Sequence, residues 1–274
     1  MKKVILAFFV LFAVKGNAQN NCCNATEQFA SLGSQAEFRG EHQLPKSGNS
    51  VKKTGSYIEF ATPDGKKGRG YLIKSAKPSN EFLFVFHEWW GLNENIINEA
   101  EEWATTFNGV NVIALDLYDG KVATTREAAG EFMQQANEVR IRNIIQGAID
   151  YAGAKAEIAT IGWCFGGGWS MQAALMMGPQ AKGCVIYYGM PERNEEMLQV
   201  LNCKVLGIFA EKDKWINRKV VGEYEKAMNE LDKPYETYWY NADHAFANPS
   251  NPVFNETAAA DAKAKTTEFL RLVF

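Results

Sequence analysis

Cys164 has the clearest potential for chemistry in this chain, because it lies at the centre of the glycine-rich segment 162–167. Residues 158–161 before it are apolar and partly β-branched, which predicts a buried parallel strand. Residues 170–177 after it read as a helix, with good helix formers and no breaker until Gly178. A cysteine between a strand and a helix, with glycines two residues away on both sides, is typical of a strained turn that presents a nucleophile.

Two other interpretations of segment 162–167 compete with a nucleophile. The first is a structural cysteine buried beside a glycine-rich turn. The second is a phosphate-binding loop, but the segment lacks the Gly-Lys-Ser/Thr ending that such a loop requires. The pattern favours the nucleophile.

A nucleophilic cysteine needs a base, and the chain holds only three histidines, His42, His87 and His244. In hydrolases with this type of turn the chain order is nucleophile, acid, histidine. Only His244 follows Cys164. It comes just after residues 235–240, which alternate like a final strand, so it can reach the carboxyl edge of a parallel sheet, where ligands usually bind. We therefore expect His244 to be the base.

The acid should lie between the nucleophile and the histidine. Residues 205–210 form a short apolar run that predicts a strand, and Asp213 lies three residues after it. Asp213 is the preferred acid, because a short carboxylate just past a strand can orient an imidazole with little freedom. Glu211 is the second choice. Asp243 is a poor candidate, since it is the chain neighbour of His244 and would normally point elsewhere.

A further group of functional candidates follows the strongly apolar run 82–86. Glu88 lies there between apolar neighbours, a setting that favours a functional carboxylate. The loop after this strand usually supplies the second oxyanion donor. We therefore expect the backbone N–H groups of Trp89 and Phe165 to bind the developing oxyanion.

Taken together, these residues resemble the dienelactone hydrolase family of α/β-hydrolases. The matching segments are the loop 87–93, the stretch 114–118, the turn around Cys164, then Asp213 and residues 244–246. The resemblance spans roughly residues 55–274. It implies a triad of Cys164, His244 and Asp213, with Glu88 as the carboxylate that contacts the resting thiol and helps to activate it. It also implies opening of an unsaturated, carboxylate-bearing lactone, with no metal and no organic cofactor.

The chain departs from the family pattern where the substrate carboxylate binds. Members that cleave dienelactone hold it with two arginines, whereas this chain has Gly120 and Asn248 at those positions. Lys121 is adjacent but lacks the bidentate fork of an arginine. The sequence therefore does not identify the natural substrate. We expect a largely apolar substrate pocket. Its lining residues should be Trp89, Trp90, Tyr118, Lys121 and Phe246.

These observations predict a hydrolase that cleaves small ester or lactone bonds through a thioester intermediate. One alternative is a carboxylesterase or thioesterase of broad specificity with the same triad. Another is a binding or redox-sensing protein that retains the fold without turnover.

The first 18 residues predict export. Basic residues precede an apolar core at 4–14, and Ala18 ends a plausible cleavage site. A core of 11 residues is too short to span a bilayer, so we expect a periplasmic or secreted protein without a membrane anchor. Cys22 and Cys23 follow the cleavage site with no assigned role, and Cys184 and Cys203 have the context of core residues.

The formal net charge is −3, without basic runs, which gives no sign of nucleic-acid binding. A small molecule is therefore the expected partner, and the oligomeric state is not indicated. Residues 19–54 are interpreted as an extension and linker, with a helix within 24–43.

Residues 55–274 are interpreted as one α/β-hydrolase domain with a mostly parallel central sheet and helices on both faces. A hairpin at 57–62 and 69–75 should form the sheet edge. Expected strands are 82–87, 111–115, 158–163, 183–188, 204–210 and 235–240; expected helices are 94–107, 126–153 with a break, 166–177, 215–231 and 256–272.

Overall fold

The computed structural model describes residues 24–45 and 51–274. The predicted signal peptide, residues 1–18, lies outside the described residues, as do Cys22 and Cys23. Within the described part of the chain, no helix is both long and apolar enough to cross a membrane.

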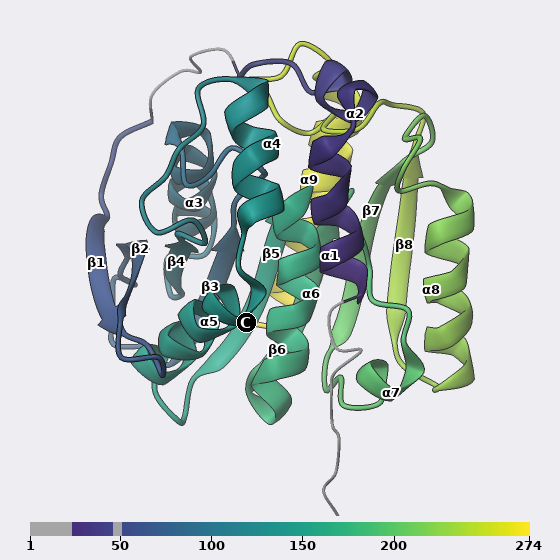
Figure 1. Ribbon diagram of the computed structural model, residues 1–274. Coiled ribbons are helices and arrows are strands. Elements are labelled where there is room, and N and C mark those ends of the chain that lie inside the picture. Colours follow the sequence, from purple (N-terminus) through teal and green to yellow (C-terminus); the bar gives the residue numbers. More distant parts are fainter. Residues whose placement is uncertain (1–23, 46–50) are drawn as a thin grey trace, which may run out of the picture.

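The centre of the protein is an eight-stranded sheet with the order β1-β2-β4-β3-β5-β6-β7-β8 (Figure 1). The first two pairings, β1 with β2 and β2 with β4, are antiparallel, and all the others are parallel. The predicted edge hairpin and mostly parallel sheet are therefore confirmed. The strands are β1 (Ser56–Ala61), β2 (Lys67–Ile73), β3 (Glu81–Phe86), β4 (Asn111–Leu115), β5 (Glu157–Trp163), β6 (Ala181–Tyr187), β7 (Lys204–Ala210) and β8 (Tyr235–Tyr240).

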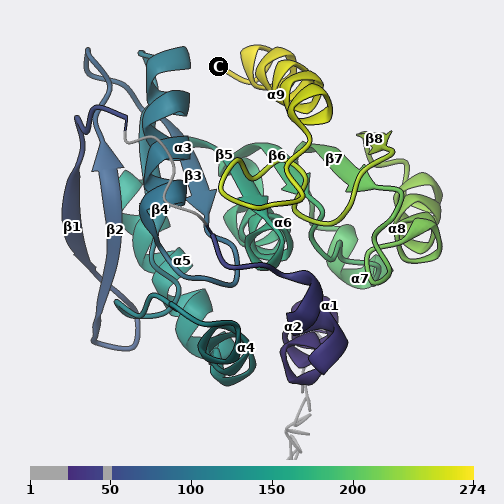
Figure 2. The ribbon, with the colours of Figure 1, turned by 90° about the horizontal axis from the view of Figure 1, so that it is seen from above.

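Helices cover both faces of this sheet (Figure 2). Helices α3 and α9 lie together on one face, where Lys263 of α9 pairs with Glu102 of α3. Helices α5 and α6 lie on the other face, joined by a hydrogen bond of 2.9 Å from Arg142 to Gln172. The helices after β3 are α3 (Glu94–Thr106), α4 (Arg126–Gln135), α5 (Glu138–Ala152), α6 (Phe165–Met177), α7 (Glu195–Leu198), α8 (Arg218–Glu230) and α9 (Glu256–Arg271).

The predicted break within 126–153 falls between α4 and α5. Asn137 there has an extended backbone, and its side chain accepts from the N–H of Arg140, so it caps the first turn of α5. The short helix α7 was not predicted, because four residues give no measurable periodicity.

The N-terminal extension folds into α1 (Asn24–Ser31), a 3₁₀ turn (Leu32–Ser34) and α2 (Ala36–Glu41), as expected for a helical segment. Its position was not predicted. Helix α1 runs beside α6, and α2 lies above the carboxyl ends of the parallel strands (Figure 1). Phe29 and Phe38 bury their rings there, and Lys214 forms an ion pair of 2.5 Å with Glu41. The extension is thus packed onto the edge of the sheet where the functional residues were expected.

Candidate active site

The turn between β5 and α6 has the strained geometry that its glycines predicted. Cys164 has φ 56° and ψ −120°, a conformation that L-residues rarely adopt and that persists only where the surroundings fix it. A Cβ on Gly162 would lie 2.0 Å from the carbonyl oxygen of Gly166, and one on Gly166 would lie 2.4 Å from that of His87. Larger residues would not fit at either position, so the turn depends on both glycines.

The sulfur of Cys164 lies at the N-terminus of α6, where the N–H of Phe165 donates to it. The side chain is only 1% exposed. Burial raises the pKa of Cys164, while the neighbouring His244 lowers it. The net increase favours the protonated thiol at rest, which is also the form least prone to oxidation.

His244 and Asp213 are directly joined. Nδ1 of His244 lies 2.5 Å from Oδ2 of Asp213, and Oδ1 accepts from the N–H groups of Trp215 and Ile216, each at 2.9 Å. Burial alone would raise the pKa of Asp213, but His244 and these N–H groups lower it overall. The carboxylate therefore stays charged and holds the imidazole in one orientation.

The other nitrogen of His244 faces the nucleophile. A ring nitrogen of His244 lies within 4.8 Å of the sulfur of Cys164, and Nδ1 is engaged by Asp213, so Nε2 is free to take the thiol proton. Burial alone would lower the pKa of His244, but the negative charge of Asp213 raises it well above its usual value. Ala245, with φ 66°, forms the tight turn that follows the histidine.

Glu211, the alternative acid, lies elsewhere: it is exposed and paired with Arg218 on the surface. Asp243 is also exposed, as expected for the chain neighbour of His244. The structure therefore brings Asp213, and neither of the other two carboxylates, to the imidazole.

Glu88 is buried and bound by Asn248. Nδ2 of Asn248 donates to Oε2 of Glu88 at 2.6 Å, while its Oδ1 accepts from the N–H and hydroxyl of Ser250. Burial raises the pKa of Glu88 to about 7, and the bond from Asn248 opposes the change. Asn248, one of the two departures from the family pattern, is thus committed to holding Glu88.

Gly120, the second departure from the family pattern, and its neighbour Lys121 lie apart from the sulfur of Cys164. Gly120 adopts φ 94°, and Lys121 is exposed, with its ammonium 5.4 Å from the ring centre of Phe132. Lys121 lines a surface cavity together with Asp119 and other residues, but Cys164 does not line it. Tyr118, a second residue expected in the substrate pocket, lines the same cavity, so the place of Lys121 in that pocket stays a prediction.

The expected aromatic residues are buried around the triad. Tyr118 packs 5.4 Å from Phe165, and burial, with a further contribution from the Cys164 thiolate, raises its pKa well above the usual value. Trp90 packs against Trp89 at 4.9 Å. Phe246 is fully buried against two tyrosines, which is ordinary core packing. Trp89 is also buried, and the oxyanion role of its backbone N–H stays a prediction.

Three residues near the triad were missed by sequence reasoning. Helix α2 places Phe38 between Trp89 and Trp215, with ring centres at 5.5 and 5.0 Å. His42, just after α2, lies 4.8 Å from the ring of His244. Tyr188 lies 5.1 Å from the same ring. The four-residue spacing of Phe38 and His42 puts both on one helical face, which was the one available signal.

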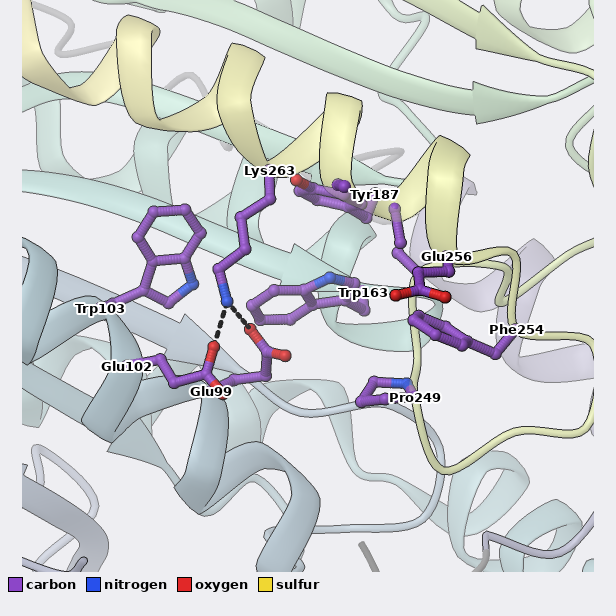
Figure 3. A pocket seen from close by; sticks show the side chains of 12 residues that line it. Glu99, Glu102, Trp103, Trp163, Tyr187, Pro249, Phe254, Glu256 and Lys263 are labelled. Carbon is purple, nitrogen blue, oxygen red and sulfur yellow. Dashed lines mark hydrogen bonds and ion pairs between the residues drawn. The ribbon is translucent and has the colours of Figure 1, made fainter. Parts of the chain in front are cut away.

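The extension therefore covers the triad: Phe38 is 0% and His42 3% exposed, and His244 beneath them is 8% exposed. A cavity of about 230 Å³ lies elsewhere, against α3 and α9 (Figure 3). Aromatic walls and the pair of Lys263 with Glu99, at 3.8 Å, line this cavity, and no triad residue does.

Comparison with known proteins points to one family. The profile of the dienelactone hydrolase family matches residues 69–274. Protein usf of Aquifex pyrophilus is 29% identical over 230 residues, which cover 79% of this chain and 98% of that relative. Carboxymethylenebutenolidase 1 of Cupriavidus pinatubonensis is 25% identical over 231 residues, covering 79% of this chain and 96% of the relative.

Solved structures show the same fold. A putative dienelactone hydrolase from Klebsiella pneumoniae superimposes with a TM-score of 0.67 at 21% identity, covering 79% of this chain and 98% of its own. The promiscuous phosphotriesterase P91 from metagenomic libraries, described as dienelactone hydrolase-like, gives a TM-score of 0.67 at 18% identity, covering 81% of this chain and 100% of its own. The helices that cover the triad, within residues 24–42, lie outside the segment that the family profile matches.

Proposed function

Since the chain belongs to the dienelactone hydrolase family, we propose that it hydrolyses small ester or lactone bonds with Cys164, His244 and Asp213 as its triad. The observation that carries this proposal is the chain of contacts from Asp213 through His244 toward a cysteine on a strained turn. Nucleophile, base and orienting acid in this order are the parts that acyl transfer needs.

The reaction has two halves. His244 takes the thiol proton as the sulfur attacks the substrate carbonyl, and the resulting imidazolium returns that proton to the departing alkoxide, leaving a thioester on Cys164. Water then gives a proton to His244 and attacks the thioester, and the departing thiolate recovers the proton. In a lactone the alcohol stays attached, so water must attack before the ring closes again.

The oxyanion of each half would be bound by the N–H groups of Phe165 and Trp89. The N–H of Phe165 is the better supported of the two, because it already points at the sulfur from the first turn of α6. Two such donors can contribute several kcal/mol to lowering the barrier.

Glu88 would control the charge state of the nucleophile. Its negative charge raises the pKa of Cys164, and its own pKa of about 7 lets it change protonation near neutrality. A substrate that displaces or neutralises Glu88 would therefore favour the thiolate at the moment of attack.

The residues at the family's carboxylate-binding positions favour a neutral acyl group. Asn248 is bound to Glu88, Gly120 has no side chain, and Lys121 is exposed away from the sulfur. We therefore propose small neutral esters or lactones, with a buried aromatic surround, as the substrate class.

We also propose that the protein is exported after cleavage behind Ala18, which the sequence of residues 1–18 supports. The intact mass of the protein recovered from the periplasm or medium tests this directly. A chain that begins at Gln19 is expected, whereas an uncleaved chain in the cytosol would contradict export.

Hydrolysis rates for a small lactone, a nitrophenyl ester and an acyl thioester test the function. We expect turnover that Cys164→Ala abolishes and the matched control Cys203→Ala retains, since Cys203 is buried away from the triad. Faster cleavage of the linear ester or the thioester would favour a broad esterase. Labelling of Cys164 by a thiol reagent without hydrolysis of any substrate would favour the binding or redox-sensing alternative.

A further inference from the structure

Three ligand atoms converge where the N-terminal cover meets the triad. One nitrogen from each of His42 and His244 and the sulfur of Cys164 all lie within 4.8 Å of one another. All three side chains are buried. They come from three distant segments: the end of the extension, the turn before α6 and the loop after β8.

The imidazole of His42 presents an unprotonated nitrogen to this point, and Nε2 of His244 faces the same point. Nδ1 of His42 lies 2.6 Å from the carbonyl oxygen of Phe38 and must donate to it, so Nε2 carries the lone pair. Nδ1 of His244 is likewise engaged by Asp213. Burial, with a further contribution from His244, lowers the pKa of His42 to about 3, which keeps it neutral at physiological pH.

Nε2 of His42 is buried and has no hydrogen-bond partner among the described residues, whereas Nε2 of His244 faces the thiol of Cys164. A buried acceptor without a partner is costly, and its persistence requires an explanation. His87 provides the contrast, because both of its ring nitrogens have hydrogen-bond partners. Nδ1 lies 2.6 Å from the carbonyl oxygen of Glu88, and Nε2 accepts from the N–H of Leu117.

We propose that His42, Cys164 and His244 bind a thiophilic divalent cation, with Zn²⁺ as the best match. Two imidazoles and one thiolate are a typical zinc ligand set, and three protein ligands leave a fourth position open. The carbonyl of Phe38 and the carboxylate of Asp213 are the outer partners that orient metal-bound histidines.

The charges and distances suit this cation. Binding requires the Cys164 sulfur and Nε2 of His244 to release the protons that they carry, and the resulting thiolate and Asp213 together balance the two positive charges. Normal Zn–N and Zn–S bonds require the three ligand atoms to approach to about 3.5 Å of one another, a contraction of roughly 1 Å. Side-chain rotation on the flanking loops can supply this.

Such a site has a regulatory consequence. A cation held by the sulfur removes the nucleophile from catalysis, and the His42 ligand ties the extension to the catalytic loops. Because His42 lies outside residues 69–274, the site depends on a segment beyond the one that defines the family.

Cobalt titration of the metal-free protein tests the proposal without relying on activity. The parent chain for this experiment carries Cys22→Ser and Cys23→Ser, so that these two thiols cannot contribute. We expect one Co²⁺ per chain, a thiolate-to-cobalt charge-transfer band, strong tetrahedral d–d bands, and displacement by one equivalent of Zn²⁺.

Variants identify the ligands. Cys164→Ser should lose the charge-transfer band, whereas Cys203→Ala should keep it. His42→Gln should weaken Co²⁺ binding at least about tenfold. Near-ultraviolet circular dichroism checks that each variant is folded. If His42→Gln does not fold, melting temperatures of the other two proteins test the site instead. Zn²⁺ should raise the melting temperature of the parent and leave the melting temperature of Cys164→Ser unchanged.

Absence of the band in the parent, or equal affinity of parent and His42→Gln, would overturn the proposal. Micromolar Zn²⁺ should also inhibit hydrolysis, reversibly with a chelator and less in His42→Gln. Since the cobalt spectrum is read without substrate, failure of the metal site and failure of the proposed hydrolase give different results.

Discussion

Asp213 and Glu211 are two residues apart, yet their hydrogen bonds give them different chemistry. Asp213 is buried, accepts from two backbone N–H groups with one oxygen and binds His244 with the other. Glu211 is exposed and paired with Arg218. At the residue scale, the orientation of the base therefore depends on one carboxylate whose geometry is fixed on both sides.

Replacing Asp213 with Asn should lower kcat by about 10³- to 10⁴-fold, because the amide would favour the wrong tautomer of His244. Glu211→Gln, the matched control, should change kcat by less than about twofold, in keeping with a surface ion pair. Steady-state kinetics and melting temperatures of both variants give the comparison. Equal losses of kcat would remove Asp213 from the mechanism.

Glu88 gives a prediction about pH. Its pKa of about 7 in the folded protein exceeds the ordinary 4.5, so folding favours its protonated form. The stability this provides is fully present below pH 4.5 and is lost as the pH rises to 7. The unfolding free energy of Glu88→Gln, relative to that of wild type, should therefore increase by about 3 kcal/mol as the pH rises from 4.5 to 7. A constant difference between the two proteins would contradict the buried, titrating carboxyl.

At the scale of elements, strand ends and one helical pair build the site. Residues after β3, β5, β7 and β8 converge because parallel strands end at the same edge of the sheet. Helix α2 then closes this edge from outside, with Phe38 seated between two tryptophans. We therefore expect access to Cys164 to depend on movement of α1 and α2 away from the sheet edge.

Phe38→Ala should loosen this cover. Removing a fully buried phenylalanine costs about 3–5 kcal/mol of packing in the closed state, so local opening becomes more frequent. We expect a thiol reagent to label Cys164 at least about tenfold faster, measured by mass spectrometry of the labelled peptide. Leu44→Ala, at an exposed position of the same segment, is the control. Unchanged labelling in Phe38→Ala would show that the cover does not limit access.

The elements around the triad could be predicted from sequence because each has a local cause. The strained turn needs Gly162 and Gly166, and apolar runs mark the strands that end beside Glu88 and Asp213. The cover could not be predicted in this way. The contact of His42 with His244 joins residues 202 positions apart, and no turn, repeat or spacing encodes that contact.

At the scale of the whole molecule, folding keeps two histidines neutral in the interior. Burial lowers the pKa of His42 to about 3 and that of His87 to about 4. A lowered histidine pKa means that stability is fully present above the ordinary value of 6.5 and is lost as the pH falls below it. His42 in the N-terminal extension and His87 in the loop after β3 therefore both make the stability of the fold sensitive to acid.

His42→Gln should relieve part of this sensitivity. Between pH 7.5 and pH 5, wild type should lose about 2 kcal/mol more unfolding free energy than the variant, because the unfolded chain takes up a proton that folded His42 rejects. Urea unfolding at the two pH values measures this difference. The same pH dependence in both proteins would mean that His42 is not held neutral in the fold.

The central claim is that an acyl group passes through the sulfur of Cys164. Rapid acid quench of the protein with excess nitrophenyl ester, followed by peptide mass spectrometry, tests it most directly. The account predicts one acyl adduct on the peptide that contains Cys164, absent from Cys164→Ala, which should also be inactive. An adduct on another side chain, or hydrolysis that survives in Cys164→Ala, would contradict it.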